Sequence, residues 1–212
     1  EKLGCRFYFP GDWGEVIPET KTITVPELNV TSRPDFAIRG IWLSCWNPPE
    51  DAKAYGEWCL KVGLSYGRDL YPVAGDGFLG MLLPPSEYAE THPEYYAMDK
   101  GGKRNITPKT PVHNTMLCLS NPDVLSASIE NLKAAFAGEK KMGCVSAHGV
   151  GISPPDGMPF CFCEQCFTAS QGFIYPAYFP ERMMSEEYCG FAVKLAQAFP
   201  DKFVSLSAYS LR

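Results

Sequence analysis

Residues 151–157, with the sequence GISPPDG, decide the fold, because they carry the strand-like run 144–152 into a rigid turn rich in Pro and Gly. Loops that leave the carboxyl ends of strands carry the ligand-binding groups of α/β proteins. Asp156 in this loop is therefore a candidate catalytic or sugar-binding carboxylate. Asp before Gly is also a common turn former, so capping the turn is the alternative role of Asp156.

A tight group of cysteines, CFCEQC at residues 161–166, comes next along the chain. Cys161, Cys163 and Cys166 are able to hold zinc, but a structural zinc site needs four ligands, and no second C-x-x-C pair supplies the fourth. The missing ligand favours a disulfide or local packing over a metal site, with inert thiols as the third interpretation. We expect no other cofactor.

The sequence has nine cysteines in all. Cys59 falls on a helical pattern and Cys118 lies in a short apolar run, so both are interpreted as small buried hydrophobes. A fourth ligand for the group would have to arrive through the fold, and the candidates are Cys144, His148 and Cys189.

Composition excludes several classes of protein. Hydrophobic residues make up 45% of the 212 positions and charged residues 20%, which suffices for a core and argues against disorder. The net charge of -5 and the lack of a broad basic stripe argue against a nucleic-acid partner. The longest apolar runs fall short of the roughly 20 residues that a membrane span needs.

Strand and helix patterns alternate after a first section, residues 1–33, which resembles the end of a preceding domain. Expected strands cover residues 36–43, 66–73, 116–119, 145–152 and 203–209. Expected helices cover residues 49–62, 124–137 and 186–199, and Ser120 or Asn121 caps the second of them. Repeated β/α units predict a parallel sheet or barrel covered by helices, and an open doubly wound sheet fits the pattern equally well.

Several blocks of sequence, in their order and spacing, resemble a bacterial family described as a domain of unknown function. The blocks are PDFxxRG at 34–40, HPEYYAM at 92–98, LCLSNPDV at 117–124, SPxDG at 153–157, the CxCxxC group and FPDK at 199–202. The family is glycoside-hydrolase-like, includes endo-β-N-acetylglucosaminidases that act on complex N-glycans, and is distantly similar to β-hexosaminidases and α-glucuronidases.

The resemblance implies a (β/α)8 TIM barrel. Such a barrel needs about 250 residues, so residues 34–212 would form about its first five strands, and residues 1–33 would end a small α/β domain. We expect the remainder of the barrel to be the partner of these strands. We also expect these 212 residues to be inactive without it.

Site residues follow from the resemblance. Arg39 is similar to the arginine that hydrogen-bonds to sugar hydroxyls in β-hexosaminidases, and the planar guanidinium group with its several donors suits this role. The alternative role of Arg39 is a structural ion pair. Asp156 matches the position of a catalytic or acetamido-orienting carboxylate, and either mechanism needs a second group. Further candidates for contact with the substrate are Trp42, Trp46, Asn121, His148 and Tyr209.

Two functions remain as hypotheses. The first is a glycoside hydrolase that cleaves N-acetylglucosamine-type β-linkages, and the second is a non-catalytic carbohydrate-binding or structural module. A redox or metal centre at the cysteines is a third. The expected partner is a glycan or oligosaccharide, and the expected location is secreted, periplasmic or at the cell surface.

Overall fold

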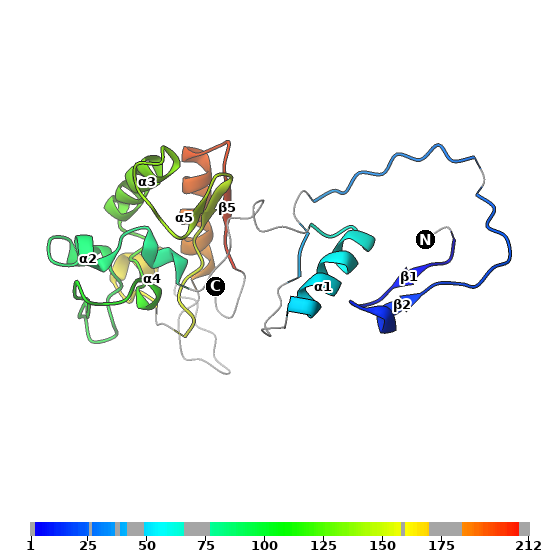
Figure 1. The fold of residues 1–212 in the computed structure, drawn as a ribbon. Coiled ribbons are helices and arrows are strands. Elements are labelled where there is room, and N and C mark those ends of the chain that lie inside the picture. The colour runs from blue at the N-terminus through cyan, green and yellow to red at the C-terminus, as the bar shows by residue number, and fades with distance from the viewer. Residues whose placement is uncertain are drawn as a thin grey trace. The chain divides into compact units, whose positions relative to one another are not determined.

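The structure is a computed structural model of the chain. It describes residues 3–25, 27–36, 39–41, 49–65, 77–157, 160–169 and 184–207. The chain divides into two compact units, Glu1–Arg68 and Asp69–Arg212, and Figure 1 labels the helices α1–α5 and the strands β1, β2 and β5. The predicted boundary after residue 33 stays a prediction.

The unit Glu1–Arg68 holds a small antiparallel sheet and one helix. Strands β1 (Arg6–Phe7) and β2 (Glu15–Val16) pair with each other, and the 3-10 turn η1 (Asp12–Gly14) precedes β2. Helix α1 (Pro49–Lys61) confirms the helix predicted over 49–62. The Trp58 indole Nε1 of α1 donates a hydrogen bond of 3.0 Å to the Phe7 carbonyl of β1, which fixes the helix to the sheet.

The unit Asp69–Arg212 contains a three-stranded mixed sheet in the order β3-β4-β5. Strand β3 (Val145–Ser146) runs antiparallel to β4 (Gly149–Gly151), while β5 (Phe203–Ser205) runs parallel to β4. Parallel neighbours need a crossover connection, usually helical. Helices α4 (Glu164–Ala169) and α5 (Ser185–Ala198) lie in this connection.

Strand β4 is buried along its whole length, and Gly149 allows β5 to approach it closely. A Cβ atom at position 149 would lie 2.1 Å from the Phe203 carbonyl oxygen, which is well inside van der Waals contact. A side chain at this position is therefore incompatible with the pairing of β4 and β5.

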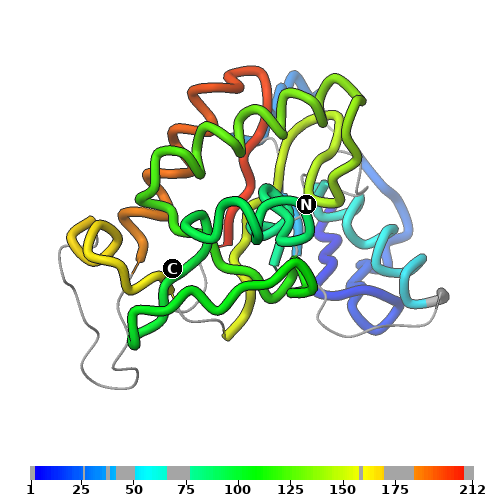
Figure 2. The backbone as a smooth tube through the Cα atoms, turned by 90° about the vertical axis from the view of Figure 1, so that its left-hand side faces the viewer, coloured from blue at the N-terminus to red at the C-terminus, as the bar shows by residue number. Residues whose placement is uncertain are grey.

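Two long helices cover the sheet. Helix α3 (Pro122–Phe136) contacts β3, and α5 contacts β5. The two helices lie side by side, as the green and orange tubes of Figure 2 show, and each contributes a fully buried leucine, Leu132 and Leu195. Burying an aliphatic side chain of this size stabilises a fold by about 1.5–3 kcal/mol. The helices predicted over 124–137 and 186–199 are confirmed to within two residues.

Short elements and turns complete the unit. They are η3 (Phe78–Met81), α2 (Pro85–Tyr88), η4 (Pro93–Tyr95) and η5 (Val112–Asn114). None of the described helices is both long and apolar enough to span a bilayer.

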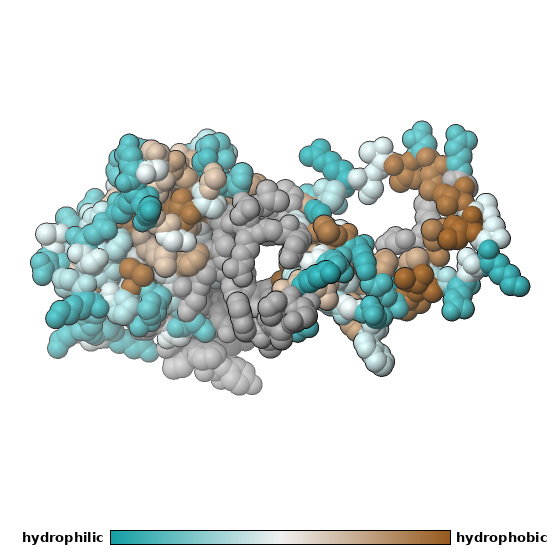
Figure 3. Space-filling view, viewed as in Figure 1, coloured by the Kyte–Doolittle hydropathy of each residue, from teal (hydrophilic) through white to brown (hydrophobic). Residues whose placement is uncertain are grey.

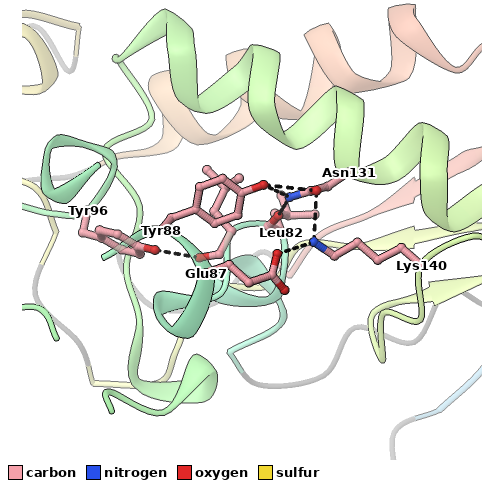
Figure 4. A network of polar contacts seen from close by, with 7 residues as sticks. Leu82, Glu87, Tyr88, Tyr96, Asn131 and Lys140 are labelled. Carbon is pink, nitrogen blue, oxygen red and sulfur yellow. Dashed lines mark hydrogen bonds and ion pairs between the residues drawn. The ribbon is translucent and has the colours of Figure 1, made fainter. Parts of the chain in front are cut away.

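A polar network fastens α3 to these short elements (Figure 4). The Asn131 amide donates to the Leu82 carbonyl at 2.8 Å, and its oxygen accepts from Lys140 Nζ at 3.0 Å. Lys140 also pairs with Glu87 at 2.6 Å. Nearby, the buried Tyr96 hydroxyl donates to the Leu83 carbonyl at 3.1 Å, and burial raises the pKa of Tyr96.

Two predicted strands are corrected by the structure. The strand predicted over 145–152 is a hairpin, whose turn is stabilised by a hydrogen bond of 3.2 Å from the His148 amide to Ser146 Oγ. The segment predicted as a strand over 116–119 forms only an isolated antiparallel bridge between Leu117 and Tyr96. Its amides and carbonyls pair with this neighbouring loop segment, so it does not join the sheet.

These corrections bear on the predicted barrel. Strand β3 occupies the edge of β4 along which a preceding parallel strand of a barrel would pair. The described residues form a mixed α/β structure without a closed barrel, and the barrel stays a prediction. The predicted strand over 66–73 lies outside the described residues, and those over 36–43 and 203–209 lie there in part.

Candidate metal centre and strand-end loop

The loop after β4 holds Asp156 at the surface of a well-anchored turn. Ile152 donates its amide to the Ser205 carbonyl at 2.9 Å and accepts a hydrogen bond of 3.1 Å from the Tyr188 hydroxyl. The Ser153 carbonyl accepts from the Leu79 amide at 3.0 Å. Residues 151–155 are buried and Asp156 is exposed, so a fixed backbone holds Asp156 at the surface beyond the carboxyl end of β4.

Arg39 lies in the other unit, where its guanidinium binds backbone. Nε and Nη2 donate to the Gly63 carbonyl at 2.8 and 2.6 Å, and Nη1 donates to the Phe36 carbonyl at 2.5 Å. These bonds are a structural role for Arg39, though not the ion pair weighed in the sequence.

Two other predicted site residues have local structural roles. Asn121 is the N-cap of α3, where its side-chain oxygen accepts from the Asp123 amide at 2.9 Å. His148 occupies the turn before β4, so it lies at the amino end of that strand, whereas Asp156 follows the carboxyl end. The structure does not bring His148 and Asp156 together. Trp42, Trp46 and Tyr209 lie outside the described residues.

Four of the described cysteines form a compact group of side chains that could act as metal ligands. The Sγ atoms of Cys118, Cys161, Cys163 and Cys166 all lie within 4.8 Å of one another, and we call these four residues the cysteine cluster. Cys118 Sγ lies 3.6 Å from Cys163 Sγ and 3.7 Å from Cys166 Sγ. All eight described cysteines are free thiols. The described cysteines thus form no disulfide in this structure, and the cluster could bind a metal; the choice between disulfide, packing and metal stays a prediction.

Three segments of chain bring the cluster together. Cys118 follows Leu117, and its amide donates to the Tyr95 carbonyl at 2.8 Å, which places it beside residues 95–98. From that segment the Met98 amide donates to Cys161 Sγ at 3.3 Å. Cys166 lies in the short helix α4, and its amide donates to Cys163 Sγ at 3.5 Å. Backbone donors thus already point at two of the four sulfurs.

The thiols of the cluster differ in acidity because they hydrogen-bond to one another. Donation by Cys118, and then by Cys166, lowers the pKa of Cys161. The hydrogen bond to Cys161 raises the pKa of Cys118 to about 12. Hydrogen bonds to Cys118 and Cys161, together with burial, raise the pKa of Cys166. Cys161 is therefore the thiol of these three that ionises first.

Arg104 supplies positive charge beside the cluster. Burial acts to lower the pKa of Arg104, but the Cys118 and Cys161 sulfurs interact with the guanidinium and raise it overall. The same side chain donates to the Tyr96 carbonyl. The cluster therefore has a cation next to the sulfurs that a metal would convert to thiolates.

Comparison with protein families gives one match, to a domain of unknown function (DUF4838), over residues 9–212. The chain belongs to the DUF4838 family. Neither the curated proteins nor the solved structures gave a match. Membership in DUF4838 leaves the activity of the chain open.

One member of the cysteine cluster was not predicted from the sequence. Cys118 was interpreted as a small hydrophobe, and it is buried as expected, but it is also the fourth thiol. Cys144 and Cys189, the cysteines weighed for that place, are outside the cluster, as is His148. A signal was available, since Cys118 lies three residues before the helix cap Asn121, and loops often carry binding residues.

A hollow near the cluster was also missed. It has a volume of about 650 Å³ and lies beside the amino ends of α4 and α5. Glu164, Glu186 and Glu187 line it together with Lys194, so carboxylates face this space.

Proposed function

We propose that this DUF4838 chain is part of a glycoside hydrolase that cleaves N-acetylglucosamine-type β-linkages in glycans. The observation that carries the proposal is the position of Asp156, an exposed residue on an anchored loop beyond the carboxyl end of β4. In α/β folds this is the end of the sheet at which ligands bind. The resemblance of the surrounding sequence blocks to glycoside-hydrolase-like proteins agrees with this placement.

Asp156 suits one of two roles in such a reaction. In the two-carboxylate route it protonates the leaving oxygen or attacks the sugar, opposite a second carboxylate. In the substrate-assisted route it orients the acetamido group of the substrate, which attacks in place of an enzyme nucleophile. Both routes require the carboxylate to be fixed in position, and the hydrogen bonds of Ile152 and Ser153 provide that support.

The test compares three forms of the full-length protein on an aryl N-acetylglucosaminide and on a complex N-glycan. Asp156→Asn should lower the rate of hydrolysis by about 10²–10⁴-fold, because a positioned acid or base contributes that much. Asp201→Asn is the matched control, since Asp201 is an exposed aspartate in the turn before β5, at the amino end of the sheet. Its rate should equal that of the wild type.

The outcomes separate the hydrolase from other functions. An unchanged rate in Asp156→Asn would remove Asp156 from the mechanism. A wild type that binds the glycan without cleaving it, and loses binding in Asp156→Asn, would identify a carbohydrate-binding module. Absence of both cleavage and binding would refute the proposal.

A further inference from the structure

We propose that the cysteine cluster is a structural zinc site, in which Cys118, Cys161, Cys163 and Cys166 bind one Zn²⁺ ion. This inference is independent of the proposed glycan chemistry. It adds Cys118 to the three cysteines that are neighbours in sequence, and so completes the set of four ligands that a closed zinc site requires.

The spacing of the sulfurs fits a single tetrahedral ion. With zinc–sulfur bonds of about 2.3 Å, the edge of a tetrahedron of sulfurs is about 3.8 Å. The measured separations of Cys118 Sγ from Cys163 Sγ and Cys166 Sγ are 3.6 and 3.7 Å. A disulfide would require about 2.05 Å between sulfurs. The cluster is therefore spaced as metal ligands are spaced.

The nature of the ligands selects the metal. Thiolates are soft ligands that favour zinc, copper(I) or iron–sulfur centres, and four of them in a tetrahedron indicate zinc or iron. In a multi-iron cluster the four thiolates are divided among two or four irons, so the sulfurs surround a larger group. Sulfurs that all lie within 4.8 Å of one another suit one ion. Four protein ligands leave no open position, which is the mark of a structural site.

The surroundings suit a negatively charged centre. Four thiolates around Zn²⁺ carry a net charge of about -2, which is costly to bury without compensation. Arg104 interacts with two of the sulfurs, and the amides of Met98 and Cys166 donate to two. The Lys100 ammonium also lies near the loop, 5.2 Å from the centre of the Phe162 ring. Simple apolar packing of thiols needs none of these donors.

The site would tie together parts of the chain that are distant in sequence. Zinc would hold Cys118 against the loop that runs from Asp156 through Cys161 to α4. The backbone bond from the Phe162 amide to the Met98 carbonyl, at 2.8 Å, already joins this loop to the segment beside Cys118. Metal binding would therefore fix the far end of the loop that carries Asp156.

The first experiment measures metal in the full-length wild type, purified from zinc-supplemented medium without a chelator or a metal-affinity tag. We expect about one zinc per chain, no visible absorption, and release of the zinc when a mercurial reagent titrates the thiols. Cobalt exchanged into the site should give the d–d and thiolate charge-transfer bands of a tetrahedral four-thiolate ion. These measurements do not depend on a variant that folds.

The second experiment uses variants. Cys118→Ser and Cys161→Ser should lose the bound zinc, while Cys189→Ser should retain it, because Cys189 is an exposed cysteine outside the cluster. Arg104→Gln should weaken zinc binding by about 10- to 100-fold, as loss of an outer-shell partner commonly does, and Arg104→Lys should weaken it less.

Four results would contradict the proposed zinc site. Wild type without bound metal, whose thiols all titrate freely, would reduce the cluster to packing. A disulfide among the four cysteines, detected by mass spectrometry without reduction, would support the disulfide interpretation in place of the zinc site. Stoichiometric iron with visible absorption would show that the bound metal is iron and not zinc. Full retention of zinc in Cys118→Ser would remove the proposed fourth ligand.

Discussion

The two units of the chain are held together in different ways. In Asp69–Arg212, helices α3 and α5, the sheet and the segments around residues 78–97 and 116–119 share one continuous apolar core. In Glu1–Arg68, the described residues bury little more than Cys59 and two glycines, and large apolar side chains such as Trp13, which is 95% exposed, face outward. Figure 3 shows brown apolar residues along the surface of this unit. The comparison teaches that hydrophobic burial stabilises the second unit, whereas backbone pairing and a few polar contacts hold the first.

The strongest test of this comparison is a pair of leucine truncations. Leu132→Ala in α3 should lower the free energy of unfolding by about 2–5 kcal/mol, because it leaves a cavity in a fully buried site. Leu60→Ala in α1 should change it by less than about 0.5 kcal/mol, because Leu60 is 70% exposed. Urea unfolding followed by circular dichroism measures both. Equal effects would show that the two units are stabilised alike.

A second pair compares polar contacts. Asn131→Ala should cost about 1–3 kcal/mol, since it leaves the buried Leu82 carbonyl without its donor. Lys61→Gln, which removes the exposed pair of Lys61 with Glu15 in the first unit, should lower the free energy of unfolding by much less. Glu130→Gln, beside Asn131 on the exposed side of α3, is the control and should have little effect. The comparison would fail if Lys61→Gln cost more than Asn131→Ala.

The smallest expected effect concerns the cap of α3. Asn121→Ala should lower the free energy of unfolding by about 1 kcal/mol, and Asn121→Ser should largely preserve it, because serine also accepts from the second residue of the helix. This result would sharpen the comparison by showing how much one local contact adds where the core dominates. Measuring glycan affinity on the same proteins tests the other role of Asn121. Lost affinity in a stable Asn121→Ser protein would assign it to substrate contact.

The helices were predictable because their signals are local. Apolar residues recur at helical spacing in α1, α3 and α5, and Pro or acidic residues open each of these helices. The cap at Asn121 was also among the positions predicted from the sequence. The strands were harder, because the run 145–152 has no Pro, Asn or Asp at the turn formed by Ala147 and His148, and so it reads as one strand.

The features of the candidate sites were likewise predictable where they depend on adjacent residues, and not where they depend on contacts between distant segments. The turn at Asp156 and the three clustered cysteines are features of adjacent residues, and the sequence identified both. Cys118 joins the cluster only through pairing of its backbone with Tyr95, a contact between segments that no local pattern encodes. The separation of His148 from Asp156 likewise depends on which end of a hairpin strand each residue occupies.

The spacing of the four cysteines along the chain also sets the order in which their cluster can form during folding. Cys161, Cys163 and Cys166 are separated by one and two residues, so the proposed zinc would be captured first by this short-range chelate, while the chain is still open. Cys118 lies 43 positions before Cys161, and its arrival closes a long loop. The cost of closing a loop grows only with the logarithm of its length. A preloaded ion would therefore act as a nucleus that draws the earlier segment in, and would favour assembly of the core from its carboxyl-terminal side.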